Sequence, residues 1–359
     1  MERIPYLEPM RATLMLLGIF LHSAQVYNPA KSWLVSAPQS LDIPILLSEF
    51  IHIFRMPAFF ILSGYLFYIS INKYPFKVFI RKRLARVLIP LIVVATTINY
   101  VQFIFINPYS WESATYKQYW VEGNWVSHLW FLINLSIYFI VFAAFFYYIN
   151  KKHIKFNIVF PRLNLYIWLC LLPISNLGLL FLNKLGFPIY SQFFGISSFM
   201  IIEYLPYFIF GLLMAQKKYI YQTYIKINIK FGLIFLMLLS AVYFTIVAYM
   251  PKMFVLDVIR LYLEYLATWL LSCLCFTSFS LLFAKVNLQW QFLASSAYSV
   301  YLFHQLIIVI LASFFIYLAL PAWLGFFLLL TITGFIAVGL HWLLVSSNRV
   351  GQILLNGKI

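Results

Sequence analysis

Ten apolar stretches, each long enough to cross a lipid bilayer as a helix, occupy most of this chain. About 20 apolar residues span the roughly 30 Å hydrocarbon core of a membrane, where helices satisfy their own backbone hydrogen bonds. We therefore predict an all-α polytopic membrane protein with about ten transmembrane helices, in which residues 1–359 form one transmembrane domain. The predicted spans are residues 10–27, 45–69, 87–107, 127–149, 164–182, 198–215, 231–250, 261–284, 295–316 and 322–345.

The charge of the chain agrees with this topology. Hydrophobic residues make up 64% of the sequence and charged residues 9%, which excludes an ordinary soluble globular protein. The net charge of +16 is interpreted by position, because cytoplasmic loops collect Lys and Arg. With a cytoplasmic N-terminus, 19 of the 25 Lys and Arg residues fall on the cytoplasmic side. The distribution predicts that both termini are cytoplasmic, and it favours membrane topology over nucleic-acid binding.

The first stretch places two ionisable residues, Arg11 and His22, on one helical face. Eleven residues at about 100° each differ by about 20° from three full turns, so the two side chains lie roughly 16 Å apart along one side. Ionisable groups within a membrane span are energetically costly and usually face the protein interior or a water-filled cavity. We treat Arg11 and His22 as the centre of a candidate site.

The second stretch carries Glu49, His52 and Arg55 at i, i+3 and i+6, along one side of a helix. Their predicted depth matches that of His22, so an acid, two imidazoles and a guanidinium are expected to converge. The alternative is a buried salt-bridged cluster that only holds helices together.

Later stretches add polar residues at similar depth and predict a polar cavity. A stripe of Tyr298, Tyr301 and His304 recurs at i, i+3 and i+6 in the ninth stretch. The other candidates lining the cavity are His128, Trp130 and Glu203.

A basic cluster precedes the third stretch. It consists of Lys77, Arg81, Lys82, Arg83 and Arg86. Such clusters bind anionic lipid head groups, and guanidinium groups also make bidentate contacts with phosphates. The cluster therefore predicts either a lipid contact or a site for a phosphorylated cytoplasmic ligand.

Two features belong to the predicted outer face. The aromatic loop at residues 108–126 fits either an interfacial belt or a surface on which sugar rings stack. Near the outer end of the eighth stretch, we predict an ion pair between Arg260 and Glu264 at i, i+4. The loop aromatics are Tyr109, Trp111, Tyr116, Tyr119, Trp120 and Trp125.

Motifs for other chemistries are missing. The sequence has no P-loop, G-x-G-x-x-G, H-E-x-x-H or G-x-S-x-G motif. His22 has no ligand four residues later, so we expect no metal site. Cys170, Cys273 and Cys275 lie in apolar stretches without zinc-site spacing, and we expect neither a disulfide nor a resident cofactor.

With these residues identified, the chain resembles the membrane acyltransferase-3 family, which is marked by an Arg, ten residues and a His in the first span. Arg11 and His22 match that spacing, FRMPAFFILSGYLF matches the second span, and the Arg-rich start with Pro90 matches the third. Within the family, LMLLGIFLH, EFIHIFRM, SGYLF and SHLWFL are most similar to members that succinylate periplasmic glucans. The similarity is strong over the first four spans; beyond residue 150 it depends on the stripe ending at His304.

The resemblance implies acyl transfer from cytoplasmic acyl-CoA, either succinyl-CoA or acetyl-CoA, to a hydroxyl of a periplasmic glycan. It places the protein in the bacterial cytoplasmic (inner) membrane. By the matching positions, His22 is the catalytic base and Arg11 its partner, and the CoA phosphates are held by Arg81, Arg83 and Arg86.

An imidazole suits this chemistry, because a base with a pKa near 6.5 can accept the hydroxyl proton as the oxygen attacks a thioester. Oxyanion donors are available in His52, Arg55, His304 or a Tyr hydroxyl, and Glu49 is a candidate to orient one imidazole. Direct transfer and an acyl-histidine intermediate are both open. If the group is succinyl, Arg55 is our candidate partner for its carboxylate.

Two alternatives are retained. The first is acetylation of another surface polysaccharide or a lipid-linked sugar. The second is a proton-coupled small-molecule transporter that uses the His and Glu residues as a relay, although the sequence shows no inverted repeat.

Overall fold

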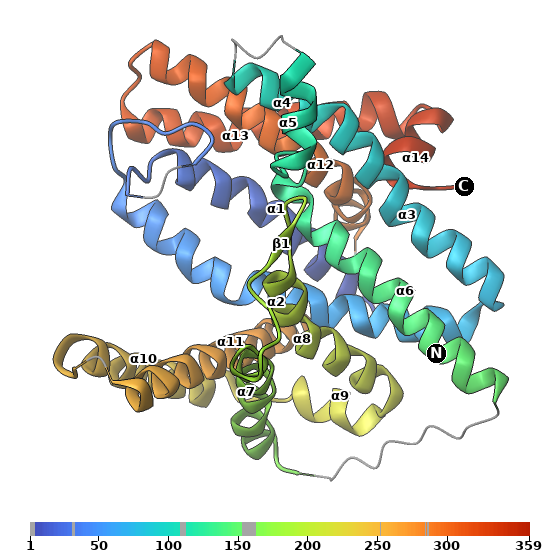
Figure 1. Cartoon of the computed structure of the whole chain (residues 1–359), viewed down its shortest axis with the longest axis vertical. Coiled ribbons are helices and arrows are strands. Elements are labelled where there is room, and N and C mark those ends of the chain that lie inside the picture. The colour runs from blue at the N-terminus through green and yellow to red at the C-terminus, as the bar shows by residue number, and fades with distance from the viewer. Residues whose placement is uncertain are drawn as a thin grey trace.

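The structure, a computed structural model, describes residues 4–30, 33–107, 113–152, 163–251, 253–283, 285 and 287–359, without the side chains of residues 113–115. Apart from one short hairpin, its elements are helices packed into a bundle (Figure 1), which confirms the predicted all-α fold. In chain order they are α1 (Leu7–Val26), α2 (Asp42–Lys73), α3 (Phe76–Thr96), α4 (Ile98–Ile106), α5 (Ser113–Val121), η1 (Ser127–Leu129), α6 (Trp130–Lys151), α7 (Leu165–Phe181), η2 (Leu182–Leu185), β1 (Gln192–Phe193), β2 (Ile196–Ser197), α8 (Ser198–Gln216), α9 (Lys218–Tyr224), α10 (Ile229–Tyr249), α11 (Phe254–Leu282), α12 (Leu288–Tyr317), α13 (Ala322–Leu340), η3 (His341–Ser346) and α14 (Arg349–Asn356).

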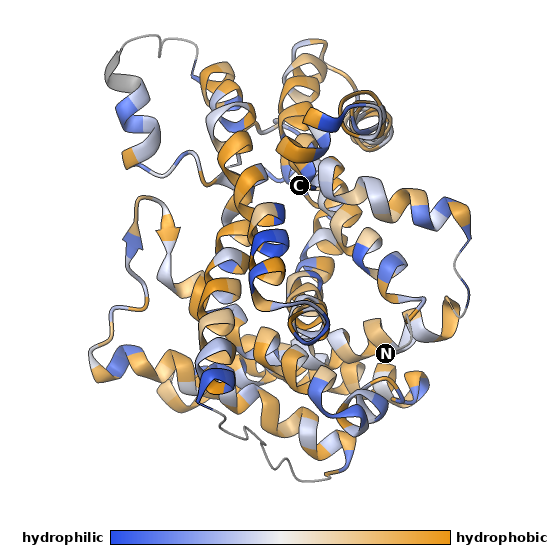
Figure 2. Ribbon diagram, turned by 90° about the vertical axis from the view of Figure 1, so that its right-hand side faces the viewer, coloured by the Kyte–Doolittle hydropathy of each residue, from blue (hydrophilic) through white to orange (hydrophobic). Residues whose placement is uncertain are grey.

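Within the described residues, nine helical segments are long and apolar enough to cross a membrane. They overlap nine of the ten predicted spans. The segment that matches the third predicted span, Phe76–Ile106, combines α3 and α4. The remaining prediction corresponds to α1, whose Arg11, His22 and Gln25 make it less apolar. Figure 2 shows hydrophobic residues along most of the long helices, with hydrophilic residues gathered in short stretches and loops. The protein is a multi-pass membrane protein.

Close backbone packing fixes α2 in the centre of the bundle. It packs most extensively against α8, as α1 does against α12. A Cβ atom added to Gly64 would overlap the Phe208 carbonyl, and one added to Gly211 would overlap the Ile61 carbonyl. Small residues at such crossings let membrane helices approach closely. This contact sets the position of α2 and of the polar residues in its N-terminal half.

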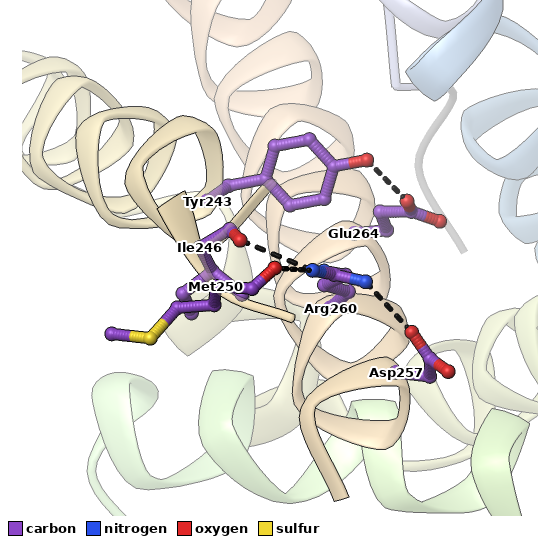
Figure 3. Close-up of polar contacts among 6 residues, drawn as sticks. All are labelled: Tyr243, Ile246, Met250, Asp257, Arg260 and Glu264. Atoms are coloured by element: carbon purple, nitrogen blue, oxygen red, sulfur yellow. Dashed lines mark hydrogen bonds and ion pairs between the residues drawn. The ribbon is translucent and has the colours of Figure 1, made fainter. Parts of the chain in front are cut away.

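Helices α10 and α11 extend to one side of the bundle (Figure 1) and are joined by polar contacts near one end. Figure 3 shows Arg260 of α11 donating to the carbonyls of Ile246 (3.1 Å) and Met250 (3.3 Å) at the end of α10. The same guanidinium pairs with Asp257 at 2.7 Å. Arg260 therefore caps α10: it gives the Met250 carbonyl a donor and adds a second donor to the Ile246 carbonyl, which also accepts from the Met250 N–H.

The prediction that Arg260 pairs with Glu264 is wrong. In the described part of the chain, Glu264 instead accepts a hydrogen bond of 2.7 Å from the Tyr243 hydroxyl (Figure 3). The reason is partly tertiary and partly local, because the α10 carbonyls and Asp257, three residues earlier on α11, draw the guanidinium toward the start of α11.

The aromatic loop packs against the β1–β2 hairpin. The Trp120 and Trp125 rings lie 5.7 Å apart, and the Trp125 indole N–H donates to the Phe194 carbonyl at 3.0 Å. Tyr119 is buried, and residues 108–112, with Tyr109 and Trp111, lie outside the described residues. The choice between an interfacial belt and a sugar-stacking surface stays a prediction.

Candidate active site

The predicted face of α1 is directed at α12. Arg11 Nη2 donates to the Ala294 carbonyl at 3.2 Å, and the His22 ring lies 5.1 Å from the His304 ring between centroids. Eleven residues on α1 thus correspond to ten on α12, as expected for two helices that run side by side in the same direction. The prediction that Arg11 and His22 share one side is confirmed.

A cavity of about 460 Å³ surrounds His22 and is called the histidine cavity below. Its walls come from α1, α2, α6 with η1, and α12. Seven of the residues predicted from the sequence line it: His22, His52, Arg55, His128, Trp130, Tyr301 and His304. The two imidazoles and the guanidinium expected from the first and second predicted spans therefore converge with polar residues of the fourth and ninth, whereas the expected acid, Glu49, does not join them.

The His22 ring is held by two neighbours. Its Nδ1 atom lies 2.8 Å from Gln25 Oε1, and the Trp33 indole stacks on it with centroids 5.6 Å apart at an interplanar angle of 18°. An amide oxygen only accepts hydrogen bonds, so Nδ1 carries the proton and Nε2 holds a free lone pair. His22 is thus oriented as a base by an amide.

His304 is oriented in the same way by the backbone. It is only 1% exposed, and its Nδ1–H donates to the Tyr301 carbonyl at 2.7 Å. Its Nε2 atom is buried without a hydrogen-bond partner among the described residues. The Tyr301 hydroxyl donates to the His128 carbonyl, which ties α12 to η1. A buried acceptor without a partner is a place where a ligand can bond.

Arg55 reaches the backbone of α1 at Gly18. A Cβ atom built at Gly18 would lie 2.9 Å from Arg55 Nη1 and 3.4 Å from His304 Nε2. Arg55 Nε is buried without a partner among the described residues. Because the described lining of the histidine cavity holds Arg55 and four imidazoles but no Asp or Glu side chain, this space favours an anionic ligand.

A second cavity lies toward the start of α1. It measures about 320 Å³, and its polar lining includes Arg11, Arg83 and Arg86; it is called the basic cavity. Arg83 Nη2 donates to the Leu66 carbonyl at 3.0 Å and also bonds Ser70 Oγ, which fixes α3 against α2. A neighbouring side cavity of about 310 Å³ shares Arg83 and Arg86 with the basic cavity.

Three apolar side chains separate the histidine cavity from the basic cavity. Met15, Phe59 and Phe131 line both, and the two Phe rings meet edge to face with centroids 4.7 Å apart. Met15 follows Arg11 by four residues and precedes His22 by seven, so all three lie on one side of α1. We call these three side chains the apolar partition. The histidine cavity and the basic cavity therefore adjoin across these side chains, between His22 and the arginines of α3.

Comparison with known proteins identifies the family. A profile described as an acyltransferase domain, Acyl_transf_3, matches residues 4–344. The chain belongs to the acyltransferase-3 family. It is 31% identical over 231 residues to glucans biosynthesis protein C from Escherichia coli strains K12, K12/DH10B and O1:K1/APEC, which covers 59% of this chain and 58% of each relative. The match thus spans less than two thirds of these relatives, and no solved structure matches the chain.

The acyltransferase does not bring every predicted residue into these cavities. Glu49 lies on an exposed part of α2 and does not line the histidine cavity. Residues three apart on a helix are separated by about 60°, so Glu49 stands about 120° from Arg55. Glu203 is also absent from the described lining. Arg81 is exposed and lies outside the basic and side cavities, whereas Arg83 and Arg86 line both.

The sequence did not predict several polar residues that line the histidine cavity. These are Gln25, Trp33, Ser127 and Gln305. Ser127 has a positive φ of 39°, and its hydroxyl accepts from Gln305 Nε2 at 2.7 Å. Gln25 lies three residues after His22, a spacing that puts the two side chains next to each other on a helix, and this signal was available in the sequence. Trp33 had no such signal, because it follows the end of α1.

Proposed function

We propose that this acyltransferase transfers an acyl group, with succinyl as the leading candidate, from cytoplasmic acyl-CoA to a hydroxyl of a periplasmic glucan. In this proposal the protein lies in the bacterial cytoplasmic membrane with both termini cytoplasmic. The observation that supports it most strongly is that the cavity lined by Arg83 and Arg86 adjoins the cavity lined by His22 across the apolar partition. The relatives named glucans biosynthesis protein C support the glucan as acceptor.

The separation of the two cavities along α1 suits an acyl-CoA. Arg11 and His22 are separated by about 16 Å of helix rise. The pantetheine arm between phosphate and sulfur contains about twelve bonds, which is equivalent to four extended residues or roughly 14 Å. With its phosphates at Arg83 and Arg86, the donor would place its thioester close to His22. The nucleotide then stays on the side of the basic cavity while the acyl group crosses the partition.

The proton transfers follow from the His22 tautomer. Nε2 accepts the proton of the glucan hydroxyl as its oxygen attacks the thioester carbon, a role that typically contributes about 10²–10⁴-fold to the rate. A C–O bond forms, the C–S bond breaks, and the CoA sulfur leaves as the thiol after receiving the proton from His22. Gln25 keeps Nδ1 protonated throughout, so the base is the nitrogen that faces the reacting atoms.

The charge of the histidine cavity supports succinyl as the acyl group. A succinyl group carries a free carboxylate, which needs a cation in a membrane interior. Arg55 is placed to bind it, because its guanidinium touches α1 at Gly18 beside His304 and can contact a carboxylate with two hydrogen bonds. The cationic lining also stabilises the developing oxyanion.

The test measures release of CoA thiol by the purified protein in liposomes, with succinyl-CoA or acetyl-CoA and a glucan acceptor. The wild type is expected to release thiol only when acceptor is present, and faster with succinyl-CoA. His22→Ala is expected to lose this release. His341→Ala is the matched control, because it removes a buried imidazole outside the histidine cavity, bonded to Ser299. Absence of turnover of either donor by folded wild-type protein would overturn the proposal.

A further inference from the structure

The segment after η3 folds back onto the basic cluster of α3. Helix α14 packs against α3 and against η3, as Figure 1 shows on the side where the chain ends. Residues 345–359 lie beyond the residues 4–344 that the family profile matches. The family match therefore says nothing about these residues, and their position beside the proposed donor site is known from the structure alone.

The backbone after α14 is locked against Arg86. Gly357 has a positive φ of 56°, and a Cβ atom there would overlap the Ala85 carbonyl and the Arg86 Cα. The Gly357 N–H donates to the Ile353 carbonyl at 2.9 Å. Glycine adopts this conformation without strain and lets two backbones approach closely. The position of the next residue, Lys358, is consequently set relative to α3.

Two residues of this segment line the cavities at α3. Lys358 lines the basic cavity and the side cavity, together with Arg83 and Arg86 in both. Asn356 lines the basic cavity, is 7% exposed, and has its Oδ1 atom buried without a partner among the described residues. No Asp or Glu side chain occurs in the described lining of either cavity. The segment thus adds a cation and an unused acceptor to a space that already repels cations.

We propose that Lys358 is a phosphate ligand of this site and that Asn356 accepts a hydrogen bond from the organic part of the same ligand. The ligand class is a nucleotide with several phosphates and an amide-containing arm, so the inference rests on the proposed function and extends its donor site. Lys358 supplies a point charge beside the bidentate guanidinium groups of Arg83 and Arg86. Asn356 Oδ1 accepts from an amide N–H of the arm as it passes toward the apolar partition.

The experiment measures equilibrium binding of CoA, 3′-dephospho-CoA and inorganic pyrophosphate to the purified full-length protein in detergent without anionic lipid. Lys358→Gln is expected to weaken CoA binding about tenfold, as charge-assisted hydrogen bonds to phosphate are among the strong ones. Arg349→Gln is the matched control, because it removes one exposed charge from α14 outside both cavities. Asn356→Leu is expected to weaken CoA binding and leave pyrophosphate binding unchanged.

The arms separate this inference from the proposed function. Loss of affinity for CoA alone assigns Lys358 to the 3′-phosphate, and equal loss for dephospho-CoA assigns it to the pyrophosphate; both support the inference. Wild-type affinity in Lys358→Gln overturns it while the donor site stands. Pyrophosphate binding that depends on Lys358 in a protein that never turns over acyl-CoA supports the phosphate site and overturns the proposed function. If Lys358→Gln instead weakens only the binding of anionic lipid added to the detergent-solubilised protein, the lysine binds lipid head groups and the inference is wrong.

Discussion

Gly18 is the position where one methyl group tests the geometry of the histidine cavity. The Cβ atom of Gly18→Ala would lie 2.9 Å from Arg55 Nη1, whereas ordinary contact begins at 3.4 Å. To restore ordinary contact the guanidinium must move by 3.4 − 2.9 = 0.5 Å. Arg55 Nη1 is the far end of a flexible side chain, so the displacement costs little stability. Replacing glycine by alanine within a helix also contributes up to about 1 kcal/mol of stability.

The expected result is a stable protein with impaired catalysis. A misplacement of about 1 Å can cost about 10²-fold in rate, so a shift of half that size predicts about a tenfold loss, equivalent to about 1.4 kcal/mol in the barrier. The loss should be larger with succinyl-CoA than with acetyl-CoA, because Arg55 is the proposed partner of the succinyl carboxylate. The assay is initial CoA thiol release with glucan, alongside the thermal midpoint.

Gly334→Ala is the matched control. Gly334 lies in α13, and a Cβ atom there meets nothing within 4 Å. It reports the gain in helix propensity without touching Arg55. If Gly18→Ala turns over both donors within twofold of Gly334→Ala, Arg55 is not held in a catalytically important position and the reasoning fails.

Three further predictions address other parts of the molecule. Gln25→Leu should lower kcat by about tenfold or more with KM for acyl-CoA unchanged, since it removes the acceptor that sets the His22 tautomer, while Gln25→Glu keeps an acceptor and should retain activity; equal rates for both would contradict this. Phe131→Ala should open the apolar partition and admit hexanoyl-CoA as a donor, measured as its rate of thiol release relative to succinyl-CoA. An unchanged ratio of the two rates would show that Phe131 does not limit access to His22. Arg260→Met should lower the free energy of unfolding by about 1–2 kcal/mol, because α10 loses its cap, and should leave kcat unchanged. Thermal unfolding and thiol release measure the two; a lower kcat in a protein of unchanged stability would contradict this structural role.

The length of the apolar stretches and the periodicity of polar residues within them determined the membrane spans and the faces on which the site residues lie. The length of the apolar stretches specified the spans, because about 20 apolar residues cross the hydrocarbon as a helix that satisfies its own backbone. The rotation of 100° per residue placed Arg11 and His22 on one side, and both face α12. The cost of a polar group in a membrane also predicted that His128 and His304 would meet His22 in a cavity.

The tertiary structure decided which partner each polar residue finds. Glu49 and Arg55 share a helix but stand about 120° apart on it, and the packing of α2 in the bundle decides that the Arg55 side faces His22. Trp33 reaches His22 because the chain after α1 turns back, and Lys358 reaches Arg83 from the far end of the sequence. Local periodicity sets the face on which a side chain lies. The identity of its neighbour depends on contacts between residues far apart in the chain, which no local pattern encodes.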